Sequence, residues 1–194
     1  MPLSPKTDLP GFSDPVLDAQ SCFRAVLEAL SRPGSVHFAG AALPPPPGLA
    51  PATAAVLLTL VDAETSLAIA PGLEAATGWI EFHCGPVASL AAHANFVLAT
   101  TLPDLAVLDT GSDEIPERAA TIILQVAALG MGRTLTLAGP GLAAATTLAV
   151  DGLPADFPAR WRANHALYPR GVDLILCAGT SVAAMPRSVT VGEA

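Results

Sequence analysis

Two arginines stand at turns near the end of the chain, each just before an apolar run. Arg170 lies in the segment YPRGVDL, between a proline and a glycine, and Arg187 follows a proline in MPRSVTV. A guanidinium donates paired hydrogen bonds that match the oxygens of a phosphate or phosphonate. This placement predicts a phosphate- or phosphonate-binding pair. The alternative is an ion pair of each arginine with one of the seventeen acidic residues, and the sequence leaves both open.

A glycine-rich turn in RTLTLAGPGLAA matches the dinucleotide-binding pattern G-x-G-x-x-G/A, with Gly139, Gly141 and Ala144 in the defining places. Two observations argue against a phosphate cradle. Pro140 has no N–H to donate to a pyrophosphate, and the following LAAATTLAVDG is too short and too rich in β-branched residues for the long helix required. We therefore expect a turn at the end of a strand. A Walker A loop is excluded, because no glycine precedes a lysine.

Nucleophilic catalysis is not indicated by the serines and lysines. The segment GTSVA resembles a nucleophile elbow centred on Ser181, but the last histidine, His165, precedes it, which is the wrong order for an α/β-hydrolase. Ser181 is therefore expected in a turn. A Schiff base with pyridoxal phosphate needs a lysine in a packed pocket. Lys6 is the only lysine and lies in a proline-rich start, so no cofactor of this kind is predicted.

The histidines and cysteines show no metal-binding spacing. His83 and Cys84 are neighbours in WIEFHC, which we interpret as a strand, so that the two side chains would point to opposite faces. His83 is expected to be partly buried, with one hydrogen bond. No metal is predicted, although the sequence leaves open a site assembled from distant residues. Cys22, Cys84 and Cys177 are odd in number and far apart, which indicates neither a disulfide framework nor a cysteine-based zinc site.

Composition narrows the class of protein. The net charge is −8, and the 194 residues are 13% charged and 52% hydrophobic. So negative a chain is not expected to bind nucleic acid, and so few charges suggest that a partner or a second copy covers part of the surface. No apolar run reaches the roughly 20 residues of a membrane span, and the start MPLSPKTDLPGFSD lacks the features of a signal peptide. We expect a cytoplasmic protein that does not bind membranes.

Helices are predicted at several places. The clearest covers DPVLDAQSCFRAVLEALSRPG, with Asp14 as its cap, Pro15 in its first turn and Arg32-Pro33-Gly34 as its stop. Its apolar residues recur on one face: Ala19, Cys22, Phe23, Val26, Leu27 and Leu30. TAAVLLTLVD is expected to be a buried helix, with a strand as the alternative, and ADFPARWRANHAL has helical character. PERAATIILQVAAL fits a helix that runs into a strand, but its periodicity does not settle this.

Short strands are predicted at SVHFAGA, TSLAIA, WIEFHC, FVLAT, RTLTLAG and RSVTV, with a buried strand at GVDLILCAG. Four prolines make ALPPPPGLAP a stiff loop. Strands interleaved with helical segments predict an α/β layered fold. We expect a single domain at residues 11–194, after a mobile N-terminal segment at residues 1–10.

Six stretches, taken together and in order, are similar to a known family. They are GFSDPVLDAQSCFRAVLEALSRPG, VLLTLVDAETSL, FHCGP, PERAATIILQVAAL, LTLAGPGL and YPRGVDLILCAGTSVAAMPRSVTV, over most of residues 11 to 191. The chain thereby resembles the PhnH family of the bacterial carbon–phosphorus lyase system. The family often has two threonines after the last Pro-Arg, where this chain has Ser188 and Val189. Ser188 keeps a hydroxyl and joins Arg170 and Arg187 as a candidate for phosphonate binding or for a subunit interface.

The resemblance implies a fold, partners and a role. PhnH-like proteins resemble the large domain of type I pyridoxal-phosphate transferases, a three-layer α/β/α fold with a mixed sheet, but lack the cofactor. They form homodimers and join PhnG, PhnI and PhnJ in a core complex. That system forms ribose 1-alkylphosphonate 5-triphosphate from ATP and an alkylphosphonate, with release of adenine. The resemblance therefore implies a subunit with a structural, assembly or ligand-capturing role, and it carries over no catalytic residue.

Two other functions remain as alternatives. An autonomous transferase acting on ATP and a phosphonate would need a general base, and the four histidines and scattered acids form no clear pair for that task. A nucleotide- or phosphonate-binding module would rest on Gly139 and Gly141.

Overall fold

The structure, a computed structural model, describes residues 9–40 and 42–193. Lys6 and most of the N-terminal segment that was expected to be mobile lie outside these residues. Within them the centre of the fold is a seven-stranded sheet. From one edge to the other its strands are β1 (His37–Phe38), β9 (Ser181–Met185), β8 (Asp173–Ala178), β5 (Thr121–Gln125), β4 (Phe96–Ala99), β2 (Ser66–Ile69) and β3 (Val87–Ala88).

The large sheet is mixed. Strands β3, β2, β4, β5 and β8 pair in parallel, whereas β9 runs antiparallel to both β8 and β1. A second, antiparallel sheet of three strands has the order β10-β6-β7. These strands are β6 (Ala128–Ala138), β7 (Thr146–Asp151) and β10 (Thr190–Glu193). The predicted α/β class with a mixed sheet is therefore confirmed.

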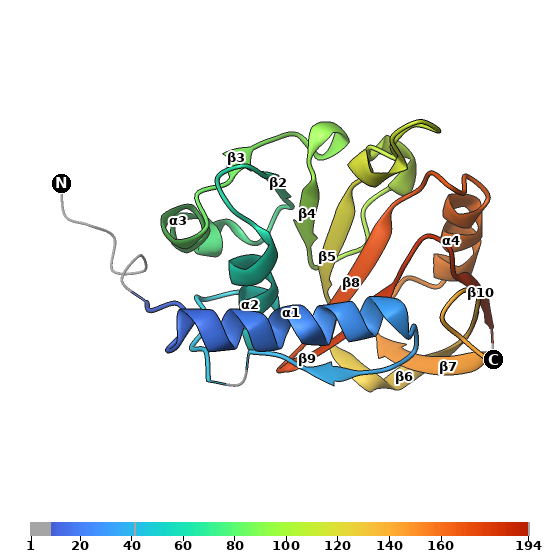
Figure 1. The fold of residues 1–194 in the computed structure, drawn as a ribbon, viewed down its shortest axis with the longest axis horizontal. Helices are drawn as coiled ribbons and strands as arrows, with labels where there is room; N and C mark the ends of the chain where they lie inside the picture. Colours follow the sequence, from blue (N-terminus) through green and yellow to red (C-terminus); the bar gives the residue numbers. More distant parts are fainter. Residues whose placement is uncertain (1–8, 41, 194) are drawn as a thin grey trace.

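Helices cover one face of the large sheet, and α1 lies across it (Figure 1). This layer consists of α1 (Pro15–Ser31), α2 (Pro51–Leu60) and α3 (Glu74–His83). The other face packs against the small sheet, the segment 102–108 and α4 (Phe157–His165), with Phe157 and Trp161 fully buried between them. The expected third layer of helices is thus largely a second sheet. Three short 3-10 turns complete the elements: η1 (Ala91–His93), η2 (Leu105–Val107) and η3 (Pro116–Arg118).

The first helix begins and ends as predicted. The Asp14 carboxylate accepts the N–H groups of Val16 and Leu17 at 3.2 and 3.0 Å, and the helix ends before Arg32. Its apolar face is only partly covered, however. Cys22 and Val26 are buried, whereas Phe23 and Leu27 are 50% and 54% exposed. The helix therefore presents part of its predicted core face to the outside.

The second helix is buried and begins directly after the proline-rich loop, as expected. Its first turn is held by Gln125 at the end of β5, whose Oε1 accepts the N–H of Ala50 at 2.6 Å and the hydroxyl of Thr53 at 2.8 Å. Gln125 also donates to the carbonyl of Gly48 at 3.0 Å. This one amide therefore joins the end of β5 to the proline-rich loop and to the start of α2, and it accepts a backbone N–H at the helix N-terminus.

The predicted strand at WIEFHC is wrong, because these residues form the second half of α3. Ala76, Trp79 and Ile80 are buried at helical spacing, and this burial outweighs the apparent alternation. His83 and Cys84 therefore end a helix and do not occupy opposite faces of a strand. His83 is partly buried and bonds the carbonyl of Leu9 at 2.9 Å, as expected of a residue with one hydrogen bond.

Three smaller differences concern strand boundaries. Ser181 was expected in a turn but is the first residue of β9, a strand that the sequence analysis did not predict; the turn is formed by Gly179 and Thr180. In the segment PERAAT only the single turn η3 forms, and β5 begins at Thr121. The last strand starts at Thr190, so that Arg187 and Ser188 precede it.

No helix in the described ranges is long and apolar enough to cross a membrane.

Candidate functional site

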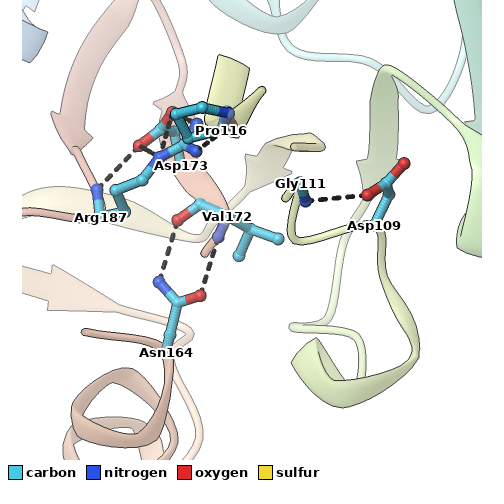
Figure 2. A network of polar contacts seen from close by, with 7 residues as sticks. All are labelled: Asp109, Gly111, Pro116, Asn164, Val172, Asp173 and Arg187. Carbon is cyan, nitrogen blue, oxygen red and sulfur yellow. Dashed lines mark hydrogen bonds and ion pairs between the residues drawn. The ribbon is translucent and has the colours of Figure 1, made fainter. Parts of the chain in front are cut away.

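Arg187 is bound to Asp173, the first residue of β8 (Figure 2). The guanidinium Nε lies 3.1 and 3.2 Å from the two carboxylate oxygens, and Nη2 bonds the same carboxylate. The backbone N–H of Arg187 also donates to Asp173, at 2.7 Å. Nη1 donates to the carbonyl of Pro116. The two side chains are only 14% and 22% exposed, so this is a largely buried ion pair whose donors are engaged within the chain.

Arg170 is more accessible. Its Nε lies 3.2 Å from an oxygen of Asp113, and the two side chains are 41% and 76% exposed. The Nε atom itself is enclosed and has no hydrogen bond of good geometry to any residue that the structure describes. The contact with Asp113 is therefore a charge interaction at the surface.

The structure brings both arginines to one loop, residues 109–118. Arg170 meets it at Asp113 and Arg187 meets it at Pro116. The loop is further fixed by Gly171, whose N–H donates to the carbonyl of Thr110 at 2.9 Å. This cluster lies where β5 and β8 begin, at the amino ends of the parallel strands. Ligands of open α/β sheets usually bind at the opposite, carboxyl ends.

Asn164 on α4 binds the backbone of Val172, the residue before β8. The sequence analysis did not identify Asn164. Its Nδ2 donates to the carbonyl of Val172 at 2.9 Å, and its Oδ1 accepts the N–H of Val172 at 2.8 Å (Figure 2). The side chain is 3% exposed. A Cβ on Gly171 would lie 3.0 Å from the Asn164 oxygens, and its φ is +117°. Glycine at this position lets the backbone approach the amide.

The segment that carries Ser188 is fixed by α4. Trp161 Nε1 donates to the carbonyl of Val189 at 2.8 Å, and His165 Nδ1 bonds the carbonyl of Arg187 at 3.0 Å. Ser188 is half-buried, and its hydroxyl has no hydrogen bond within the described ranges. Of the three predicted site residues, Ser188 thus lies beside the ion pair of Arg187, while Arg170 approaches the shared loop from the start of β8.

The glycine pair of the dinucleotide-like pattern is a turn between β6 and β7, as predicted. A Cβ on Gly139 would lie 2.9 Å from the carbonyl oxygen of Ser188, and a Cβ on Gly141 would clash with that of Ser31. Both glycines are required by close backbone contacts with other segments. The residues that follow form strand β7 and not a helix.

The thiols offer no nucleophile. Burial, and to a lesser extent the negative charge of Asp62, raise the pKa of Cys84 to about 11. Burial also raises the pKa of Cys22 and of Cys177. All three thiols are therefore protonated near neutral pH, which makes them unreactive. Among the described residues no group of three or more histidines, cysteines and acids is placed to hold a metal ion.

Comparison with known proteins gives the family. The sequence model described as "Bacterial phosphonate metabolism protein (PhnH)" matches residues 10–192. The chain belongs to the PhnH family. One relative, named alpha-D-ribose 1-methylphosphonate 5-triphosphate synthase subunit PhnH, of Rhizobium meliloti (strain 1021), is 37% identical over 183 residues, which cover 91% of this chain and 92% of the relative.

A second relative is named putative C-P lyase subunit protein HtxG, of Stutzerimonas stutzeri. It is 35% identical over 176 residues, which cover 89% of this chain and 85% of the relative. The resemblance to the PhnH family that the sequence indicated is thereby confirmed, along with its place in phosphonate metabolism.

Proposed function

We propose that this chain is a subunit of a ribose 1-methylphosphonate 5-triphosphate synthase within a carbon–phosphorus lyase complex. In that role it supports formation of ribose 1-alkylphosphonate 5-triphosphate from ATP and an alkylphosphonate, with release of adenine. The observation that carries the proposal is the match to two relatives with such names over 89% or more of the chain. The complex would be cytoplasmic, and its other members would be PhnG, PhnI and PhnJ.

The contribution of the chain is assembly or ligand capture more than chemistry. Its thiols are protonated, and Arg187, the better buried of the two candidate arginines, is neutralised by Asp173. These features support a chain that is inactive by itself. For Arg170 and Arg187 the internal contacts favour a role in holding loop 109–118 in shape for a partner subunit over direct binding of a phosphonate. Ser188, beside Arg187, stays a candidate for the interface or for a phosphonate.

The exposed apolar face of α1 supports an association with another subunit or with a second copy. Phe23 and Leu27 are about half exposed although they lie at core spacing on the helix. The predicted homodimer would cover such a face. The likeness to the large domain of type I pyridoxal-phosphate transferases remains part of this proposal, and the mixed sheet with antiparallel β9 is compatible with it.

The experiment that tests the function is adenine release from ATP and methylphosphonate by the co-expressed core subunits, with and without this chain. We expect release to be lost when the chain is omitted and restored when it is added. Undiminished release without it would refute an obligatory role in this step. Turnover of ATP by the purified chain alone would instead support the autonomous transferase.

Variants separate assembly from capture. The double variant Phe23→Ser/Leu27→Ser should dissociate the complex or the dimer on size-exclusion chromatography, whereas Val107→Ser, which is 54% exposed on η2, should not. Arg170→Ala and Arg187→Ala are expected to weaken assembly or ligand capture. Unchanged pathway flux in both arginine variants would argue against a site at loop 109–118.

A further inference from the structure

A crevice of about 410 Å³ lies at the carboxyl end of β4, whereas the arginine cluster described above lies at the amino ends of the parallel strands. It is formed by the loop that follows β4, the loop that joins β7 to α4, and α4 itself. The chain passes from β2 outward to β3 and then back to β4 on the other side of β2, so the strand order reverses at this place. Open α/β sheets bind ligands outside the carboxyl ends of strands near such a reversal, in clefts of about this size.

The crevice contains a guanidinium with unused donors. Arg160 Nε lies 2.8 Å from an oxygen of Asp156, one turn earlier on α4. The Nη groups of Arg160 have no hydrogen bond to the residues described, and the side chain is 39% exposed. The two Nη groups remain able to donate a pair of hydrogen bonds to the oxygens of a phosphate or phosphonate.

Two further polar side chains line the same crevice. Thr101 supplies a hydroxyl and Asp151 a carboxylate, and in the described ranges neither side chain forms a hydrogen bond. Carboxylates of this kind accept hydrogen bonds from the hydroxyl groups of a ribose. The loop that follows Asp151 and leads to α4 is held in place by Arg133, which donates to the carbonyl of Ala155 at 2.6 Å.

Arg160 also borders a second cavity, of about 320 Å³, on its other side. Its apolar lining comes from Leu105 and Ala106 of η2, from Ala163 of α4 and from Leu167 just after that helix, and Asp104 and Asn164 also border it. Arg160 and Ala163 are three residues apart and share one side of α4, and Leu167 continues the lining in the turn after the helix. One guanidinium therefore separates a polar crevice from an apolar cavity. This arrangement suits a ligand that has an acidic group with a hydroxylated part on one side and an apolar part on the other.

We propose that this crevice binds a phosphorylated or phosphonylated ribose. The acidic group binds the Nη atoms of Arg160, the sugar hydroxyls bind Asp151 and Thr101, and an alkyl substituent enters the apolar cavity. The inference rests on the proposed function, which makes such sugar esters the molecules that the complex handles. Because its sugar hydroxyls add hydrogen bonds to Asp151 and Thr101, a sugar phosphate should bind more tightly than inorganic phosphate, although both are repelled by the nearby carboxylates.

The test is calorimetric titration of the purified full chain with ribose 5-phosphate, and separately with inorganic phosphate and with methylphosphonate. Arg160→Gln should weaken binding of ribose 5-phosphate by at least about tenfold, because a charge-assisted pair of hydrogen bonds is lost. Asp151→Asn should weaken binding of the sugar phosphate but not of inorganic phosphate. Arg162→Gln, on the exposed side of the same helix, is the matched control and should bind as the unchanged chain does.

Absence of ribose 5-phosphate binding by the unchanged chain, or equal losses in the Arg160 and Arg162 variants, would overturn the site. Tighter binding of inorganic phosphate than of the sugar phosphate would overturn it too. Each variant's melting curve shows whether it is folded. The adenine-release assay separates the two proposals. If release requires the chain and the Arg160→Gln variant restores it fully, the proposed function stands and only the crevice is refuted.

Discussion

Arg187 and Asp173 are joined by both the side chain and the backbone of the arginine. The carboxylate accepts bonds from Nε and Nη2 and also from the N–H of Arg187. Since Asp173 begins β8 and Arg187 lies between β9 and β10, the pair connects the large sheet to the small one. Nη1 adds the loop 109–118 through Pro116. Three separate segments thus meet at one guanidinium.

Arg187→Met is predicted to lower the free energy of unfolding by about 2–4 kcal/mol, because it leaves the shielded carboxylate of Asp173 without a countercharge. Arg170→Met should cost less than about 1 kcal/mol, because its partner Asp113 is mostly exposed. Urea denaturation of both variants measures the difference. A double variant, Asp173→Asn/Arg187→Met, should recover part of the loss. Equal effects of the two single arginine variants would contradict a special role for the buried pair.

The arginines could be selected from the sequence, but their partners could not. Arg187 is 14 residues from Asp173 and 71 from Pro116. Seventeen acids were possible partners, and local spacing does not choose among them. Asn164 and Gln125 gave no signal either, because a single amide within a helix or at a strand end looks like any polar residue. Their roles depend on which backbone groups the fold brings opposite them.

Asn164→Ala is predicted to destabilise the chain by about 2–4 kcal/mol, since it leaves the N–H and the carbonyl of Val172 without partners in the interior. Asn164→Asp should be at least as harmful, because a carboxylate would face the Val172 carbonyl. Asn95→Ala is the control. Its Oδ1 accepts bonds from Ser66 at 2.9 and 2.7 Å, but at an exposed place, so its loss should cost about 1 kcal/mol or less. Similar unfolding midpoints for Asn164→Ala and Asn95→Ala would refute the explanation.

The glycine turn allows a matched comparison of two substitutions. Gly72 and Gly141 have φ values of +94° and +85°, but a Cβ on Gly72 meets nothing within 4 Å, whereas one on Gly141 clashes with the carbonyl of Ser31. Gly72→Ala should therefore cost about 1–2 kcal/mol for its backbone conformation alone. Gly141→Ala should cost about 2 kcal/mol more, because α1 and the turn must move apart. Thermal unfolding of both variants checks this, and equal costs would show that the turn yields easily.

The fold was predictable where one element buries one regular face. The cap at Asp14, the buried strand β8 and the helical α4 follow from local pattern. WIEFHC was wrongly predicted as a strand because its alternation of apolar and polar residues fits one. Its buried helical face includes Ala76 together with Trp79 and Ile80, and Ala76 lies outside these six residues. Strand β9 was missed because SVAAM has weak strand propensity and is defined by its pairing with β8. The second sheet depends on pairing between β6 and β10, which are distant in the sequence.

The three buried thiols predict how stability depends on pH. The pKa of Cys84 is raised from its usual value near 9 to about 11 in the folded chain, and those of Cys22 and Cys177 are raised as well. Between these values the unfolded thiol loses its proton while the folded one keeps it, so the unfolded state binds fewer protons. The stability from the buried thiols is therefore complete below about pH 9 and falls as pH rises to 11, by up to about 1.4 kcal/mol per pH unit for each thiol.

Urea denaturation at pH 8, 9.5 and 10.5 measures this decline, and Cys84→Ala should make it less steep. The native chain should react slowly with a thiol reagent at pH 8 and expose three free thiols on unfolding. Asp62→Asn should lower the pKa of Cys84, because a nearby negative charge is removed. Fast labelling of the native chain at pH 8, or stability that rises between pH 9 and 11, would show that the thiols are not enclosed in the folded protein in solution.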